Sequence, residues 1–223
     1  MLAHVNGIDI YYEKTGAGRP LLMVHGNGED HTIFDEAVAV LKDRFTCYCV
    51  DSRGHGQSGA ADELHYSDMA DDMIGLMEQL DLRDVLFYGF SDGGVVGLLT
   101  ASRCGRVTGL IVSGANVSPK GICLRLRLEI RLMYLFRRDP RLRLMLREPD
   151  ISDDTLRRIT VPTLVLAGDS DLITERETRH IAGTIPGAEL RILEGEGHET
   201  YIIHRTRIAE LILEYAKKTE SRR

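Results

Sequence analysis

The sequence has no tryptophan and no excess of positive charge, and each shortage argues against a class of function. Tryptophan forms the flat aromatic platforms that many carbohydrate-binding surfaces use, and none is present. The 28 lysines and arginines are outnumbered by 34 aspartates and glutamates, for a formal net charge of −6. Dedicated nucleic-acid-binding domains are usually basic. We therefore expect neither a carbohydrate platform nor a nucleic-acid partner.

The sequence has few cysteines, and their spacing matches no paired-cysteine motif. The four cysteines are Cys47, Cys49, Cys104 and Cys123. They form no Cys-x-x-Cys motif and no cluster with histidine at zinc-ligand spacing, so we expect no metal site. Two of them, Cys47 and Cys49, lie in an apolar run and are interpreted as small buried side chains with reduced thiols.

Long apolar runs are also missing. No stretch approaches the roughly 20 residues that a membrane-spanning helix needs. The first twelve residues, MLAHVNGIDIYY, lack a basic region followed by a long apolar one, which is the pattern of a signal peptide. These features predict a soluble cytoplasmic protein without a membrane span.

Short apolar runs are plentiful, and several are apolar at nearly every position. They cover residues 8–12, 21–24, 47–50, 85–88, 107–112, 163–167 and 189–193. Such runs are typical of parallel strands that are covered on both faces. The 223 residues fit a single domain of the larger kind.

Helix-length periodic segments alternate with these runs. Residues 68–80, 174–184 and 205–217 each place their apolar side chains on one face. Ser67 is a candidate N-cap for the first, and Thr174 with Glu177 has the spacing of a capping box. Alternating strands and helices predict an α/β fold with a mostly parallel, doubly wound sheet. The first two runs have no helix between them, which predicts an antiparallel start.

One basic segment breaks the alternation. Residues 118–150 contain nine basic and four acidic side chains, so this segment has a net charge of +5 and the rest of the chain −11. From Leu124 to Leu132 apolar and charged residues alternate as in a strand, whereas the spacing of Leu128, Leu132 and Phe136 fits a helix. We expect residues 118–157 to form a helical insertion outside the sheet.

The motif Gly-Phe-Ser-Asp-Gly at residues 89–93 directly follows one apolar run and precedes a helix-compatible stretch. In a strand–turn–helix setting, a G-x-S-x-G sequence forms a sharp turn that lifts the serine hydroxyl above the sheet. The flanking positions must be small because the backbone there is strained. Ser91 is therefore a candidate nucleophile.

A serine hydroxyl needs a general base, and the base needs an orienting group. The run at 163–167 is followed by Asp169 and Asp171, and the run at 189–193 is followed by His198. The carboxyl ends of parallel strands meet at one edge of the sheet. The sequence therefore predicts that an acid and a histidine approach Ser91, in the chain order Ser, Asp, His.

Taken together, five motifs resemble those of the α/β-hydrolase superfamily over nearly the whole chain. They are His-Gly-Asn-Gly at 25–28, Asp-Ser-Arg-Gly-His-Gly-Gln-Ser at 51–58, the serine turn at 89–93, Gly-Asp-Ser-Asp at 168–171 and Gly-Glu-Gly-His at 195–198. The resemblance implies one α/β-hydrolase domain over residues 1–223, with a lid at 118–157 that is short for this family. It points to an esterase-like serine hydrolase.

The resemblance also implies roles for individual residues. Ser91 is the expected nucleophile, His198 the base and Asp171 the acid, because the family places the acid at the fourth position of this turn. Asp169 is the alternative. Some relatives carry the acid after an earlier strand, but residues 113–116 here read Ser-Gly-Ala-Asn and contain no carboxylate.

The expected oxyanion hole consists of the backbone N–H groups of Asn27 and Asp92. No cofactor is implied. The predicted reaction is hydrolysis of carboxylic esters of small molecules through an acyl-enzyme. Relatives with the same triad cleave carbon–carbon bonds, lactones, amides or thioesters, and a receptor that only binds its ligand is a further alternative. A serine at position 91 argues against the dehalogenase and epoxide hydrolase branches, which use aspartate there.

Two charged features bear on the substrate, and they conflict. Asp92 follows the nucleophile and either attracts an ammonium group or is only a solvated or helix-N-terminal acid. The basic lid either favours anionic substrates or is a solvated face. His25 and His55 lie in loops of the family motifs, where we expect packing and hydrogen bonding. The oligomeric state does not follow from the sequence.

Overall fold

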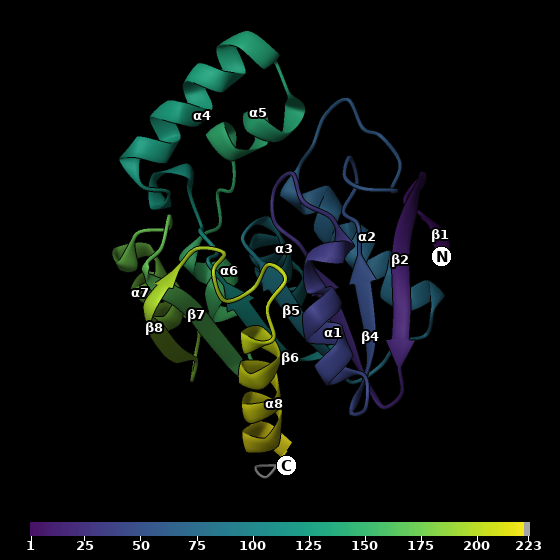
Figure 1. Cartoon of the computed structure of the whole chain (residues 1–223). Helices are drawn as coiled ribbons and strands as arrows, with labels where there is room; N and C mark the ends of the chain where they lie inside the picture. Colours follow the sequence, from purple (N-terminus) through teal and green to yellow (C-terminus); the bar gives the residue numbers. More distant parts are fainter. Residues whose placement is uncertain (221–223) are drawn as a thin grey trace.

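The computed structural model describes residues 1–220, and its centre is an eight-stranded sheet (Figure 1). The strand order across the sheet is β1-β2-β4-β3-β5-β6-β7-β8. The strands are β1 (Leu2–Val5), β2 (Ile8–Gly16), β3 (Arg19–Val24), β4 (Phe45–Val50), β5 (Val85–Phe90), β6 (Val107–Ser113), β7 (Thr163–Ser170) and β8 (Glu189–Gly197). All seven apolar runs lie within strands, so the predicted α/β fold is confirmed.

The sheet is parallel from β4 through β8, while β1 and β2 are antiparallel to their neighbours. The predicted antiparallel start is therefore correct, although β4 lies between β2 and β3. All six residues of β5 are buried, because helices cover both faces of the sheet at its centre. Parallel strands that are covered on both faces have continuous apolar sequences, which is why the central strands could be predicted from the sequence.

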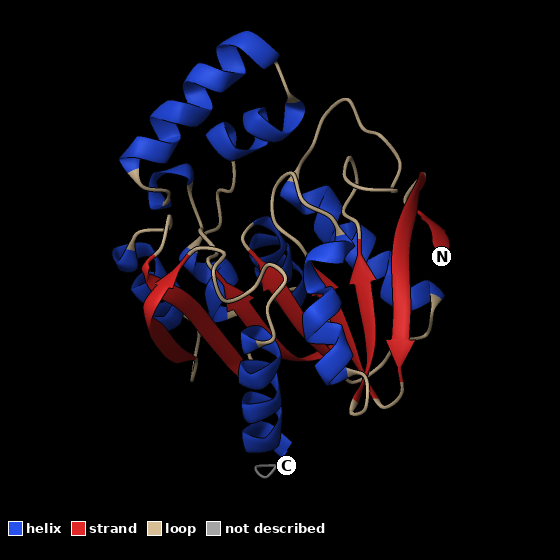
Figure 2. Cartoon of the chain, in the orientation of Figure 1, coloured by secondary structure: helices blue, strands red, loops and turns tan. Residues whose placement is uncertain are grey.

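Helices pack on both faces of the sheet, as Figure 2 shows. They are α1 (Asp35–Leu41), α2 (Tyr66–Gln79), α3 (Asp92–Ala101), α4 (Leu124–Arg137), α5 (Pro140–Arg147), α6 (Asp153–Arg157), α7 (Glu175–Thr184) and α8 (Arg207–Glu220), with short 3₁₀ helices at His31–Phe34 and Pro119–Gly121. Buried side chains of α1 and α8 form one apolar cluster with the sheet. Those of α2, α3 and α7 form the other.

The start of α2 differs from the prediction. The helix begins at Tyr66, and the residue before it, His65, makes no side-chain cap. Instead Glu148, which directly follows α5 in the lid, accepts a 3.1 Å hydrogen bond from the Tyr66 N–H. A distant carboxylate thus satisfies the helix terminus in place of Ser67. At α7 the prediction is confirmed, since the Thr174 side chain accepts from the Glu177 N–H.

The basic insertion contains α4 and α5, which stand apart from the sheet at the top of the view in Figure 1. The alternation from Leu124 onward forms a helix and not a strand. None of the described strands pairs with this segment, and its backbone forms the local hydrogen bonds of a helix. Ile130 is the one buried side chain of α4.

Candidate active site

Ser91 occupies the turn between β5 and α3. Its φ of 52° and ψ of −114° fall outside the regions that residues with a side chain normally adopt. Such strain costs on the order of 1–3 kcal/mol and persists only where the surroundings hold it. The Ser91 N–H donates a 2.8 Å hydrogen bond to the Ser113 carbonyl at the end of β6, which holds the turn in place.

The two glycines of the motif allow close backbone approach. A Cβ on Gly89 would lie 2.1 Å from the Gly93 carbonyl oxygen, and one on Gly93 would lie 2.0 Å from the Val24 carbonyl oxygen. These obstructing atoms belong to the backbone and cannot move aside as a side chain would. The turn that presents Ser91 therefore requires glycine at both positions.

The structure brings together the three residues predicted from the sequence. His198 Nε2 lies 3.0 Å from Ser91 Oγ, and His198 Nδ1 lies 2.6 Å from Asp171 Oδ1. The Asp171 side chain is only 2% exposed and that of His198 12%. Asp171 also accepts hydrogen bonds from the backbone N–H groups of Gly168 and Ile173. A buried carboxylate held in this way orients the imidazole, which in turn can accept the serine proton.

Asp169, the alternative acid, is directed elsewhere. Its Oδ2 accepts a 2.9 Å hydrogen bond from the Gly195 N–H, and its Oδ1 accepts one from the Ser170 hydroxyl. The pairing of β7 with β8 is irregular between Gly168 and Ser170. Asp169 thus joins the ends of two strands, whereas Asp171 faces His198.

The two predicted oxyanion donors lie at neighbouring loops. Asn27 follows β3 and Asp92 is the first residue of α3. Within the described chain, neither backbone N–H donates a hydrogen bond to another protein group. The Gly93 N–H donates to the His25 carbonyl, which ties the loop after β3 to the turn of Ser91.

The carboxylate of Asp92 is buried, so the interpretation as a solvated acid is wrong, whereas its position as the first residue of α3 agrees with the alternative of a helix-N-terminal acid. Its Oδ1 accepts a 2.7 Å hydrogen bond from the Tyr66 hydroxyl, and its Oδ2 a 2.8 Å hydrogen bond from Asn27 Nδ2. Burial raises the pKa of Asp92, while these two donors act in the opposite direction. With both oxygens engaged inside the protein, the side chain braces the site and is poorly placed to meet a substrate ammonium group.

Glu29 was not singled out in the sequence, yet it lies beside Ser91. Its Oε2 and the Ser91 Cβ are 2.8 Å and 3.0 Å from the position that a Cβ on Gly26 would take. The Gly26 N–H donates a 2.8 Å hydrogen bond to Glu29 Oε2. Burial raises the pKa of Glu29 to about 7, against the lowering effect of that hydrogen bond and of His198. No motif or spacing in the sequence indicates a role for Glu29, because it reaches the site only through the folded conformation of the loop after β3.

His25 holds the neighbouring loops together. Its Nδ1 lies 2.7 Å from the Gly26 carbonyl oxygen, and its Nε2 accepts a hydrogen bond from the Ser52 N–H. Burial lowers the pKa of His25 to about 4, so the ring is neutral at pH 7. This geometry agrees with the hydrogen-bonding role expected of His25.

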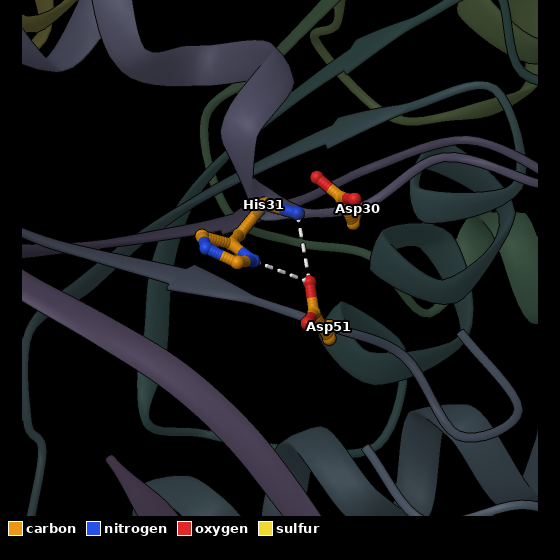
Figure 3. A group of neighbouring side chains, drawn as sticks. All are labelled: Asp30, His31 and Asp51. Atoms are coloured by element: carbon orange, nitrogen blue, oxygen red, sulfur yellow. Dashed lines mark hydrogen bonds and ion pairs between the residues drawn. The ribbon is translucent and has the colours of Figure 1, made fainter. Parts of the chain in front are cut away.

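A second group of titratable side chains lies where the loops after β3 and β4 meet (Figure 3). Donor atoms of Asp30, His31 and Asp51 all lie within 4.8 Å of one another, a spacing that could suit a metal ion. They are already used within the protein. Asp51 Oδ1 accepts from the His31 N–H and lies 2.8 Å from His31 Nδ1, while Asp30 Oδ1 caps the Thr32 N–H. We interpret the group as a brace between the loops after β3 and β4.

Comparison with known proteins matches this architecture to a family. A model of the alpha/beta hydrolase family matches residues 21–155, more than half of the chain. The chain belongs to the alpha/beta hydrolase family. The match includes the loop after β3 and the turn of Ser91 and ends within α6.

Individual relatives are distant. A putative non-heme chloroperoxidase of Synechocystis sp. is 26% identical over 262 aligned positions, covering 93% of this chain and 95% of that protein. The non-heme chloroperoxidase CPO-A1 of Kitasatospora aureofaciens is 37% identical over 93 residues, 40% of this chain and only 33% of its own length. This alpha/beta hydrolase therefore aligns with about a third of that relative.

Among solved structures, an esterase of Exiguobacterium antarcticum superimposes with a TM-score of 0.85 at 23% identity, covering 97% of this chain and 98% of that one. At this identity the likeness concerns the fold. No helix within residues 1–220 is long and apolar enough to cross a bilayer.

Proposed function

We propose that this alpha/beta hydrolase is a serine esterase that cleaves carboxylic esters of small molecules through Ser91, His198 and Asp171. The observation that carries the proposal is the continuous hydrogen-bonded chain from Ser91 through His198 to Asp171, with separations of 3.0 Å and 2.6 Å. The strained turn presents the serine at the end of that chain. The esterase among the structural neighbours is consistent with this chemistry.

In the proposed reaction, His198 Nε2 accepts the Ser91 proton while the serine oxygen attacks the ester carbonyl. The backbone N–H groups of Asn27 and Asp92 donate to the oxyanion that forms, each contributing about 10²–10³ in rate. His198 then protonates the departing alcohol, which leaves an acyl group on Ser91. A water molecule, deprotonated by His198, attacks that acyl group and releases the acid and the free serine.

The direct test is turnover of p-nitrophenyl acetate together with labelling by a fluorophosphonate probe. We expect Ser91→Ala to lower kcat by roughly 10⁶-fold and to abolish labelling. Ser170→Ala is the matched control, because its exposed hydroxyl lies on the same edge of the sheet outside the hydrogen-bonded chain. Undiminished turnover by purified Ser91→Ala enzyme would overturn the assignment.

The type of bond is tested separately. A screen over acyl esters, lactones, amides, thioesters and ring-opened dienones, with Ser91→Ala as the blank, ranks the substrates by kcat/KM. We expect esters to rank first. A higher rank for dienones or lactones would keep the triad and change the substrate class. Failure of the wild-type protein both to turn over any substrate and to react with the probe would instead indicate a receptor.

A further inference from the structure

A cleft with a volume of about 780 Å³ lies between α4, α5 and the segments that join them to the sheet. Residues 118–120 and 149–150 line it together with side chains of both lid helices. Ser91, Asp171 and His198 do not line it. The volume of the cleft is within the usual range of small-molecule binding sites. Because the three residues of the triad do not line it, a ligand bound there would be distinct from the substrate of the proposed hydrolysis.

The cleft is strongly basic. Lys120, Arg127, Arg131 and Arg147 line it, and Asp150 is the one acidic side chain among the lining residues. In the described part of the chain, none of these four cations forms an ion pair or side-chain hydrogen bond with a protein group. Cations gathered around a concave, partly apolar wall create a positive potential that attracts anions.

Arg127 provides an independent sign of a missing partner. Its Nε is buried and has no hydrogen-bond acceptor among the described residues. A buried donor without an acceptor is unfavourable, and native structures rarely tolerate one without a reason. Because Nε has no accessible surface in this arrangement, an anionic oxygen in the cleft would reach it once the unpaired Arg127 side chain turns towards the cleft that it lines.

The remaining wall is aliphatic. Leu124, Leu128, Met145 and Leu146 line the cleft beside the cations. Leu124 and Leu128 are 61% and 58% exposed, and the same helix continues with the exposed Phe136. Unpaired cations beside uncovered aliphatic side chains fit a ligand that has both an anionic and an apolar part. A dimer formed lid to lid fits poorly, because the two copies of residues 118–150, each with a net charge of +5, would repel each other.

The segment that leads into the cleft at Ser118 is held by hydrogen bonds to the rest of the protein. Glu177 Oε1, from α7, accepts hydrogen bonds from the Val117 and Ser118 N–H groups. The Cys123 N–H, at the start of α4, donates a 2.8 Å hydrogen bond to the Leu172 carbonyl. Little conformational freedom in this segment remains to be lost when a ligand binds, which favours binding.

We propose that this cleft is a binding site for an anionic amphiphile, a molecule in which one carboxylate or phosphate group is joined to an aliphatic chain. The anionic group lies between Arg127 and Arg131, and the chain packs on the leucines of α4. The inference concerns equilibrium binding and is independent of the proposed esterase activity.

The test is calorimetric titration of the full-length protein with octyl phosphate below its micelle concentration. We expect one molecule to bind per chain, with an affinity that falls as salt is added because exposed charges are screened. Inorganic phosphate and octanol, each carrying half of the ligand, should bind at least tenfold more weakly. Equal binding of inorganic phosphate and octyl phosphate would reduce the cleft to an anion patch and overturn the proposal.

Matched variants localise the site. Arg127→Gln and Arg131→Gln should each weaken octyl phosphate binding at least tenfold. Arg125→Gln is the control on the same helix, since Arg125 pairs with Glu129 and does not line the cleft. It should stay within twofold of wild type. A thermal midpoint for each variant checks folding, and the exposed Arg131 keeps the test valid if Arg127→Gln unfolds. Equal losses for all three variants would contradict the site.

Vesicle binding distinguishes a free anionic amphiphile from the headgroups of an anionic bilayer as the ligand. Flotation with phosphatidylglycerol vesicles, compared with phosphatidylcholine vesicles, measures docking on an anionic bilayer. Binding of monomeric octyl phosphate with or without vesicle binding supports the cleft. Vesicle binding in the absence of any octyl phosphate binding would replace the cleft site by a flat membrane-docking face of α4.

Discussion

The Tyr66 hydroxyl donates a 2.7 Å hydrogen bond to Asp92 Oδ1, and so joins the first residue of α2 to the residue that follows Ser91. The same Tyr66 donates its backbone N–H to Glu148, which directly follows α5 in the lid. One buried residue therefore connects the lid, α2 and the turn of Ser91, through its backbone N–H on one side and its hydroxyl on the other. The position of the proposed oxyanion donor Asp92 depends on this connection.

We expect Tyr66→Phe to lower the free energy of unfolding by about 1–3 kcal/mol, because it leaves a buried carboxylate oxygen without its donor. Urea unfolding at neutral pH measures the change. Tyr134→Phe is the control, since the Tyr134 hydroxyl forms no hydrogen bond with residues 1–220 and the ring is half-buried on the lid. Equal stability of the two variants would show that the Tyr66–Asp92 hydrogen bond contributes nothing.

The two aspartates after β7 should differ sharply in their effect on catalysis. We expect Asp171→Asn to lower kcat on the order of 10⁴-fold, because the amide favours the wrong imidazole tautomer. Asp169→Asn should change kcat little, since Asp169 bonds to the Gly195 N–H and not to His198. Steady-state hydrolysis of p-nitrophenyl acetate compares them. A larger loss of kcat for Asp169→Asn than for Asp171→Asn would show that Asp169, and not Asp171, is the acid.

Glu29 predicts a pH-dependent change in stability. Burial raises its pKa from 4.5 to about 7, so between these values the folded protein holds a proton that the unfolded chain has released. Stability therefore falls as pH rises through this window and stays lowered above it. Glu29→Gln removes the titration and keeps an acceptor for the Gly26 N–H.

The measurement for Glu29 is the thermal midpoint of the wild-type and Glu29→Gln proteins across the pH range. Relative to wild type, we expect the variant to gain stability as the pH rises from 4.5 towards 7. A difference between the two proteins that does not vary with pH would contradict an elevated pKa for Glu29. Ester turnover measured in parallel shows whether the neighbouring Ser91 is affected.

Gly89→Ala should be among the most damaging substitutions, because its Cβ would lie 2.1 Å from the Gly93 carbonyl oxygen. We expect a loss of about 4 kcal/mol or more, or no folded protein. Gly183→Ala is the opposite case. Gly183 lies in α7 with nothing within 4 Å of the added Cβ, and the substitution should stabilise by about 0.4–1 kcal/mol. Chemical unfolding measures both, and similar effects would refute the steric argument.

The sequence by itself determined the features that arise from local chemistry. Seven of the eight strands were visible as apolar runs, and the runs were clearest for the five strands β3 to β7, which are parallel and largely buried. Only the four-residue β1 was too short to show a pattern. The Thr174 cap was visible because its hydrogen bond joins residues three apart. The Gly-x-Ser-x-Gly turn was visible because the backbone approach forbids any side chain at Gly89 and Gly93.

Tertiary structure decided what depends on residues far apart in the chain. The start of α2 at Tyr66 follows from Glu148, which lies 82 positions away. The burial of Asp92 follows from Tyr66 and Asn27, and the raised pKa of Glu29 from the packing of its loop. The pairing of β7 with β8 directs Asp171, and not Asp169, towards His198. These outcomes depend on the distances between side chains that are far apart in the chain and on the exclusion of water from them. Both are established only when the strands and loops have packed.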